Sequence, residues 1–285
     1  MRTYEEFPVY VPLGEERLSA VVCVPADSPR DLGVLLVAGG NMGRTHANRM
    51  WVQIARLLAA RGVASIRFDY HGMGDSSSLE SMHFDIEKPL VGDVRAVADF
   101  LQRATGVRHL ASVATCYGAR TAIAVAAERP DVIHVTALPF PLFRGTRLGT
   151  RSRVRERVNR FRLGGALLER PAVLRLRRRL AGNRTLEGGQ VSPGLVRDLE
   201  VLLGRGTVTF VYGDRTRYLA ELREALAVLE PRLDAGQRHR LRVTVIKDMD
   251  LHRYATVAEQ EIAIEHAVGS IDEAARRVDL RAMST

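Results

Sequence analysis

One short stretch near the middle of the chain places a cysteine at a sharp corner of the backbone. The apolar run from His109 to Ala114 is typical of a buried strand, and the alanine-rich run from Ala119 to Ala127 is typical of a helix. Cys116 lies between them. A strand that turns at once into a helix crowds its corner, so only small residues fit two positions before and after it, where Ala114 and Gly118 stand. The alternative is a buried free cysteine at an ordinary strand–helix junction.

Strand-like and helix-like segments alternate along most of the chain. Continuous apolar runs predict strands at 33–37, 63–68, 109–114, 132–138, 207–212 and 241–246. Helical spacing of apolar residues predicts helices at about 47–60, 90–102, 219–229 and 257–271. Residues 7–12 and 17–25 alternate and predict an antiparallel hairpin before the first of these units. The order predicts an α/β fold, a mostly parallel sheet with helices on both faces.

The alternation breaks between residues 140 and 201. Val154, Val158 and Phe161 share one helical face, and a second helical pattern follows Pro171. Fourteen arginines and two acidic residues lie between positions 144 and 184, so this segment carries +12 and the rest of the chain −3 of the net +9. We interpret residues 140–201 as an arginine-rich helical cap inserted into a core formed by residues 1–139 and 202–285.

Composition excludes several classes of protein. No run of eighteen apolar residues is present, which excludes a membrane span, and the acidic start of the chain does not resemble a secretory signal. Two cysteines, Cys23 in a predicted strand and Cys116, form no disulfide framework, so we expect a cytoplasmic protein. We predict no metal and no cofactor, because no zinc-like spacing of Cys and His occurs. Only Phe161 interleaves the arginines, which disfavours nucleic-acid binding.

The corner at Cys116 resembles the nucleophile elbow of the α/β-hydrolase family, with cysteine in place of serine and Ala114 in place of the usual glycine. Asp214 follows the 207–212 strand and His252 follows the last one, which is the family's order of nucleophile, acid and histidine. The resemblance implies a Cys-His-Asp triad of these three residues. The family pattern Gly-x-x-Asp would select Thr216 instead, so the acid is Asp214 in a shortened turn or comes from elsewhere.

The same resemblance implies an oxyanion hole. Its donors would be the backbone N–H of Tyr117 and that of Gly40 or Asn41, in the loop after the 33–37 strand. The glycine-rich loop 71–76 resembles the family's loop after the next strand, and we expect it to support the site from beneath. We expect His46 and His83 to be surface residues.

A cysteine nucleophile suits acyl groups that stay activated, because moving an acyl group from a thioester to a thiol is nearly thermoneutral. Cysteine-bearing members that the chain resembles include dienelactone hydrolase, carrier-protein acyl shuttles and Dieckmann-type cyclases. The chain resembles the serine-bearing type II thioesterases more distantly. We therefore expect a cysteine-dependent thioesterase, acyltransferase or cyclase in natural-product biosynthesis. The alternative is a non-catalytic or non-hydrolytic member that binds a ligand or promotes an elimination without a covalent intermediate.

The arginine-rich segment bears on the partner. The substrate would be a small-molecule or carrier-protein-bound acyl group, and an acyl carrier protein, which is acidic, would fit a basic cap. The alternative interpretation of this charge is a solvated face of a cap helix.

Overall fold

The computed structural model describes residues 4–39, 42–78, 84–144, 147–148 and 190–283. An eight-stranded sheet runs in the order β1-β2-β4-β3-β6-β7-β9-β10. Its strands are β1 Tyr4–Leu13, β2 Glu16–Pro25, β3 Leu32–Val37, β4 Ala64–Phe68, β6 His109–Ala114, β7 Val132–Ala137, β9 Thr207–Gly213 and β10 Leu241–Ile246. The β1–β2 and β2–β4 pairs are antiparallel, and the remaining pairs are parallel. A separate two-stranded ladder pairs β5 Phe84–Asp85 with β8 Arg147–Leu148.

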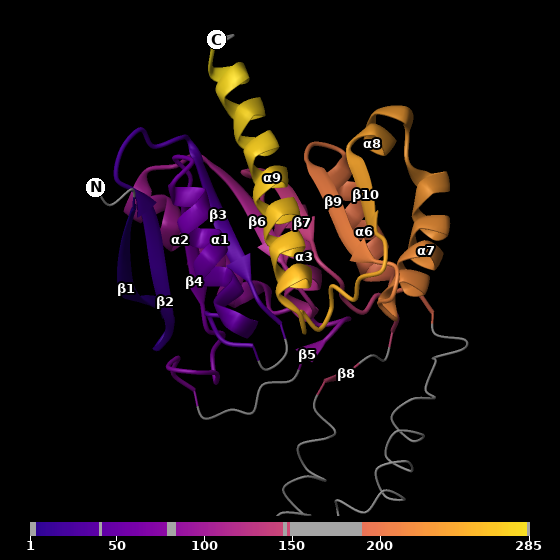
Figure 1. Ribbon diagram of the computed structural model, residues 1–285, viewed down its shortest axis with the longest axis horizontal. Coiled ribbons are helices and arrows are strands. Elements are labelled where there is room, and N and C mark those ends of the chain that lie inside the picture. The colour runs from indigo at the N-terminus through magenta and orange to yellow at the C-terminus, as the bar shows by residue number, and fades with distance from the viewer. Residues whose placement is uncertain (1–3, 40–41, 79–83, 145–146, 149–189, 284–285) are drawn as a thin grey trace, which may run out of the picture.

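Helices cover both faces of the sheet (Figure 1). The helices are α1 Met50–Ala59, α2 Val91–Thr105, α3 Tyr117–Glu128, α6 Pro193–Leu203, α7 Tyr218–Leu229, α8 Ala235–His239 and α9 Val257–Ala282, with short 3-10 turns at Ala47–Arg49 and Glu230–Arg232. One apolar cluster joins the sheet to α1 and α9, and a second joins it to α2, α3, α6 and α7. The parallel strands share one direction and end at one edge of the sheet, the lower edge in Figure 1.

Strand β3 shows why a continuous apolar run becomes a central strand. All six of its residues are buried, because successive side chains of a strand point to opposite faces and both faces are covered by helices. Leu35 and Val37 pack toward α2 and α3, whereas Val34 and Leu36 pack toward α1 and α9. The predicted hairpin, parallel sheet and two helical layers are therefore confirmed. The closing helix is longer than predicted and extends to Ala282. Beyond residue 271 its buried face continues through Ala274, Ala275 and Val278.

The described chain leaves the core and returns to it at one point. Phe143 forms an antiparallel bridge with Val191, and the backbone N–H of Arg144 donates to the Gln190 carbonyl at 2.8 Å. Most of the predicted cap, including its two predicted helices, lies outside the described residues. Helix α6, at the end of the predicted cap, packs against α3 in the main core. We therefore propose residues 144–190 as the limits of an insertion.

Candidate active site

Cys116 lies at the sharp turn between β6 and α3. Its backbone has φ 52° and ψ −138°, a region that non-glycine residues rarely occupy. The turn is closely packed, because a Cβ atom at Gly118 would lie 2.3 Å from the carbonyl oxygen of Ala38 and one at Gly39 would lie 2.5 Å from the backbone nitrogen of Tyr117. The side chain at the corner is thus held at the carboxyl edge of the sheet, the geometry of a nucleophile elbow.

Hydrogen bonds from two neighbouring segments hold this turn. The Cys116 backbone N–H donates to the Pro139 carbonyl at 3.2 Å, and the Leu138 N–H donates to the Ala114 carbonyl at 2.8 Å, which ties the elbow to the end of β7. On the other side, the hydroxyls of Thr115 and Tyr254 are 3.2 Å apart. The strained conformation is therefore over-determined by its surroundings.

The Cys116 thiol is neutral in this environment. Burial raises its pKa to about 11, although the backbone N–H of Tyr117, as a hydrogen-bond donor, and the guanidinium charge of Arg217 both lower it. The Cys116 residue as a whole is only partly buried, so the sulfur is shielded yet not sealed from the surface. The structure thus places a thiol at the predicted position without an ion-paired thiolate.

The predicted base, His252, lies in the loop after β10. Burial and the charge of Arg217 lower the pKa of His252, whereas the Asp250 carboxylate and a hydrogen bond with the Pro139 carbonyl raise it. The imidazole meets the Tyr218 ring edge to face, with ring centroids 4.7 Å apart. Because Pro139 also accepts from the Cys116 N–H, the structure brings His252 and Cys116 to the same carbonyl group.

The structure does not join Asp214 to His252. Asp214 follows β9, its residue is exposed, and the Nδ1 atom of His252 is buried with no hydrogen-bond partner among the described residues. The position that a Gly-x-x-Asp pattern selects is Thr216, which is only 5% exposed and whose hydroxyl also has no partner in the described chain. Asp248 pairs with Arg215 instead, at 2.6 Å. The role of Asp214 as the triad acid thus stays a prediction without a supporting contact.

The predicted oxyanion donors are only partly described. The Tyr117 N–H opens α3 and points at the sulfur of Cys116, whereas Gly40 and Asn41 lie outside the described residues. The next part of that loop is anchored, because Arg44 bonds to the carboxylates of Asp69 and Asp75. Asp69 follows β4 and is itself almost fully buried, so Arg44 links the glycine-rich loop to the loop after β3. Support of the site from beneath by this loop stays a prediction.

The prediction that His46 is a surface residue is wrong. His46 is 7% exposed, and its ring packs against Trp51 at 4.6 Å and Tyr254 at 5.4 Å between centroids. Burial lowers its pKa to about 4, so it is a neutral part of the core. Trp51 is only five residues away, but Tyr254 comes from the segment before α9, a contact that the sequence pattern near His46 could not reveal. His83 lies outside the described residues.

Sequence reasoning missed Arg217 and Tyr218. Arg217 lies in the turn before α7, its guanidinium stacks on the Tyr218 ring at 4.6 Å, and it also donates to the Tyr218 hydroxyl. Its charge acts on both Cys116 and His252. No local motif marks this arginine among the forty arginines of the chain; only the convergence of the β9 and β10 loops on the elbow brings it there.

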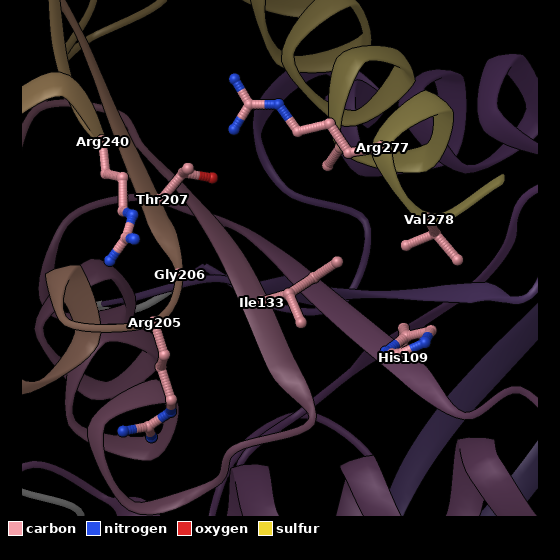
Figure 2. A pocket seen from close by; sticks show the side chains of 9 residues that line it. His109, Ile133, Arg205, Gly206, Thr207, Arg240, Arg277 and Val278 are labelled. Atoms are coloured by element: carbon pink, nitrogen blue, oxygen red, sulfur yellow. The ribbon is translucent and has the colours of Figure 1, made fainter. Parts of the chain in front are cut away.

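A cavity of about 90 Å³ lies at the other end of the sheet (Figure 2). It is lined by His109 and Thr207, at the starts of β6 and β9, and by three arginines. Figure 2 shows the three guanidinium groups pointing in different directions instead of toward one point. Arg205 and Arg240 donate to the last carbonyls of α3 and of α6, respectively, which explains their presence without a ligand.

The described residues contain neither a metal-binding cluster nor a membrane-spanning helix. No group of three or more His, Cys, Asp or Glu side chains within them is arranged to hold a metal ion. None of the helices in this part of the chain is both long enough and apolar enough to span a membrane.

The sheet, the helical layers and the elbow define an α/β-hydrolase fold. Residues 30–199 match the family model described as serine aminopeptidase, S33, and the chain belongs to this hydrolase family. The family is typically serine-dependent, and this chain has Cys116 at the elbow. No curated protein matches the chain.

Solved structures share the fold at low sequence identity. An esterase from Pyrococcus furiosus is 14% identical, with a TM-score of 0.61 and coverage of 93% of this chain and 91% of that one. A dienelactone hydrolase from Anabaena variabilis is 15% identical, with a TM-score of 0.61 and coverage of 95% and 98%. A protein from Thermus thermophilus is 20% identical, with a TM-score of 0.58 and coverage of 94% and 99%. At these identities the similarity shows the fold alone.

Proposed function

We propose that the protein is a cysteine-dependent acyl-transfer enzyme that acts on a thioester-bound acyl or acyl-peptidyl group in natural-product biosynthesis. The observation that carries the proposal is Cys116 at φ 52° at the elbow, with the Tyr117 N–H directed at its sulfur. A single strained residue between strand and helix is costly to maintain, and it presents its side chain to a bound substrate. Membership of a hydrolase family supports acyl chemistry in general.

The protonation states of Cys116 and His252 in the free protein indicate how the proton is transferred. The pKa of Cys116 is raised to about 11 and that of His252 is lowered, so thiol and imidazole are both neutral near pH 7. A preformed thiolate–imidazolium pair is therefore disfavoured. We propose that His252 acts as a general base, which removes the proton while the sulfur attacks.

The reaction would proceed in two balanced halves. The Cys116 sulfur forms a bond to the carbonyl carbon of the thioester, its proton passes to His252, and the Tyr117 N–H stabilises the oxyanion by about 3 kcal/mol. The bond to the leaving sulfur then breaks, and His252 returns the proton to that thiolate. In the second half, water, an alcohol, an amine or a carbon acid of the substrate itself loses a proton to His252 and forms a bond to the acyl carbon. The bond from that carbon to the Cys116 sulfur then breaks, and His252 returns the proton to the sulfur, which gives hydrolysis, transfer or cyclisation.

Intact-protein mass spectrometry tests this proposal. The protein is incubated with the hexanoyl thioester of N-acetylcysteamine and then weighed. We expect the mass to increase by one acyl group in the wild type and in Cys23→Ala, which removes the only other cysteine and serves as the matched control. Cys116→Ala should remain unmodified. An unmodified wild type, or equal labelling of Cys116→Ala, would refute the proposal.

The second candidate is a protein that binds its ligand, or promotes an elimination, without a covalent intermediate. The raised pKa of Cys116 favours it, and so does the Nδ1 atom of His252, which has no hydrogen-bond partner among the described residues, because neither is expected of a strongly activated nucleophile–base pair. This candidate predicts that wild type and Cys116→Ala bind or convert a ligand equally well. The same pair of proteins therefore separates the two functions.

A carrier protein is the partner that we propose for the arginine-rich insertion. The proposal rests on the +12 charge between residues 144 and 184, and an acidic carrier domain would be attracted to it at low ionic strength. Acylation from a carrier-bound thioester should therefore slow with added salt more steeply than acylation from N-acetylcysteamine thioesters. Equal salt dependence would count against the partner.

A further inference from the structure

We propose that Arg217 binds a carboxylate carried on the acyl group of the substrate, so that the enzyme is selective for acidic acyl thioesters. The inference rests on the proposed function at Cys116 and names its substrate class. Its starting point is the position of Arg217, at the turn between β9 and α7, beside the residues that carry the chemistry.

The geometry fixes the guanidinium relative to the site. It stacks on the Tyr218 ring at 4.6 Å, and that ring contacts the His252 imidazole at 4.7 Å in an edge-to-face arrangement. The same arginine donates to the Tyr218 hydroxyl. A stacked, hydrogen-bonded guanidinium loses little further freedom when it binds a ligand, so it is a preorganised cation at the rim of the site.

One acidic side chain of the described chain, Glu221, acts on the charge of Arg217 without forming an ion pair with it. Among the described residues Arg217 makes no ion pair, in contrast to Arg215, which pairs with Asp248 at 2.6 Å. The partly buried carboxylate on the next turn of α7, that of Glu221, accepts a hydrogen bond from the Leu142 N–H at 2.8 Å, and desolvation raises its pKa. An unpaired arginine that is exposed beside a thiol and an imidazole therefore remains open to an anion from outside the protein.

A carboxylate balances the single charge of this cation, whereas a phosphate monoester carries about −1.5 to −2 at pH 7. A single planar guanidinium matches the two oxygens of one carboxylate, and the single charges balance. Arg217 also lowers the pKa of both Cys116 and His252, so a bound carboxylate would raise both pKa values together and would not by itself drive proton transfer between them. The charge on the acyl group would thus act by orienting the substrate.

Matched thioesters test the inference. Glutaryl and adipoyl thioesters of N-acetylcysteamine are compared with their pentanoyl and hexanoyl counterparts, and hexanoyl coenzyme A tests an anion on the leaving-group side. We expect kcat/KM for the acidic acyl groups to exceed that for the neutral ones by about tenfold to a hundredfold. In Arg217→Gln this ratio should fall toward one, whereas Arg217→Lys should keep part of it. Arg215→Gln is the matched control and should keep all of it.

The ratio separates recognition from activation. Loss of the Arg217 charge raises the pKa of Cys116 for every substrate. An effect on activation alone therefore lowers kcat/KM equally for acidic and neutral acyl groups and leaves the ratio of the two unchanged. The inference would be overturned if the wild type showed a ratio of acidic to neutral kcat/KM near one, or if Arg217→Gln left that ratio unchanged. A preference for hexanoyl coenzyme A that Arg217→Gln abolishes would also overturn it, because the anion would then sit on the leaving group.

A binding measurement keeps the two proposals distinguishable. Calorimetry with Cys116→Ala measures adipoyl and hexanoyl thioester affinities with no acyl transfer. Tighter binding of the adipoyl compound that is lost in Cys116→Ala/Arg217→Gln supports carboxylate recognition even when no acyl adduct forms on the wild type. Equal affinities would overturn recognition even when Cys116 is acylated.

Discussion

The carbonyl oxygen of Pro139 connects Cys116 to His252. It accepts the Cys116 backbone N–H at 3.2 Å, and its hydrogen bond with the His252 imidazole raises the pKa of that residue. The two predicted catalytic residues therefore meet at a main-chain group at the end of β7. The imidazole is positioned by the backbone and by Tyr218, and no carboxylate contacts its Nδ1 atom within the described chain.

The pH dependence of alkylation should report the raised pKa of Cys116. Burial raises this pKa to about 11, so the thiolate fraction grows about tenfold per pH unit between pH 7 and 9.5. The rate of iodoacetamide labelling should rise with that slope and show no plateau near neutrality. Cys23 is fully buried and its pKa is raised to about 12, so Cys116→Ala should be labelled far more slowly. A plateau near pH 7 would mean that the thiol is activated in the free protein.

A carboxylate at position 216 should strengthen the base. Thr216 is buried, its hydroxyl has no partner in the described chain, and it stands where the family pattern places the acid. In Thr216→Asp we expect the pKa of His252 to rise and acyl turnover to increase at least about tenfold, since an orienting carboxylate stabilises the imidazolium. The pH–rate profile of kcat/KM measures both effects.

Two matched variants control for that substitution. Thr216→Asn has a similar shape without the charge and should give no increase. Asp214→Asn tests the remaining prediction that Asp214 is the triad acid; a change within about twofold, as for an exposed surface substitution, would contradict that prediction. A large loss in Asp214→Asn would instead establish Asp214 as the triad acid and contradict the prediction for position 216.

A methyl group at position 39 should disrupt the elbow. A Cβ atom at Gly39 would lie 2.5 Å from the Tyr117 nitrogen and 2.6 Å from the Gly118 nitrogen. Both are backbone atoms at the start of α3, so the clash cannot be relieved by the movement of a side chain. We expect Gly39→Ala to lower the free energy of unfolding by more than about 2 kcal/mol. Gly92→Ala in α2, where a Cβ atom meets nothing within 4 Å, should be neutral or stabilising by up to about 1 kcal/mol. Urea denaturation of both variants checks the difference.

Two buried histidines should make the protein sensitive to acid. Burial lowers the pKa of His46 and of His134 to about 4, below the ordinary value of 6.5. The unfolded chain then binds more protons than the native one between these values, so the free energy of unfolding falls as the pH drops from about 6.5 toward 4. Each residue contributes at most about 3 kcal/mol to this loss.

Denaturation at pH 7 and pH 4.5 measures the effect. His134→Gln keeps hydrogen-bonding capacity toward Thr207. It should reduce the difference in the free energy of unfolding between pH 7 and pH 4.5 by the contribution of one histidine. His239→Gln changes an exposed histidine in α8 and should leave the difference unchanged. Equal stability of the wild type at both pH values would show that these histidines are not held neutral.

Much of the architecture can be predicted from short stretches of the sequence. The apolar run of β3 predicts a strand covered on both faces, and the small residues around Cys116 predict the elbow, because both depend on neighbours only a few residues away. The order of Cys116 and His252 along the chain also predicts their meeting, since parallel strands end at one edge of the sheet.

The tertiary structure decided the electrostatics of the site. Burial keeps Cys116 and His46 neutral, and the convergence of the β9 and β10 loops brings Arg217 beside His252, whose Nδ1 atom contacts no carboxylate among the described residues. The sequence by itself determined where a nucleophile would stand. Which charges surround it depends on side chains that are remote in the chain and adjacent only after folding, because desolvation and Coulomb interactions act through space.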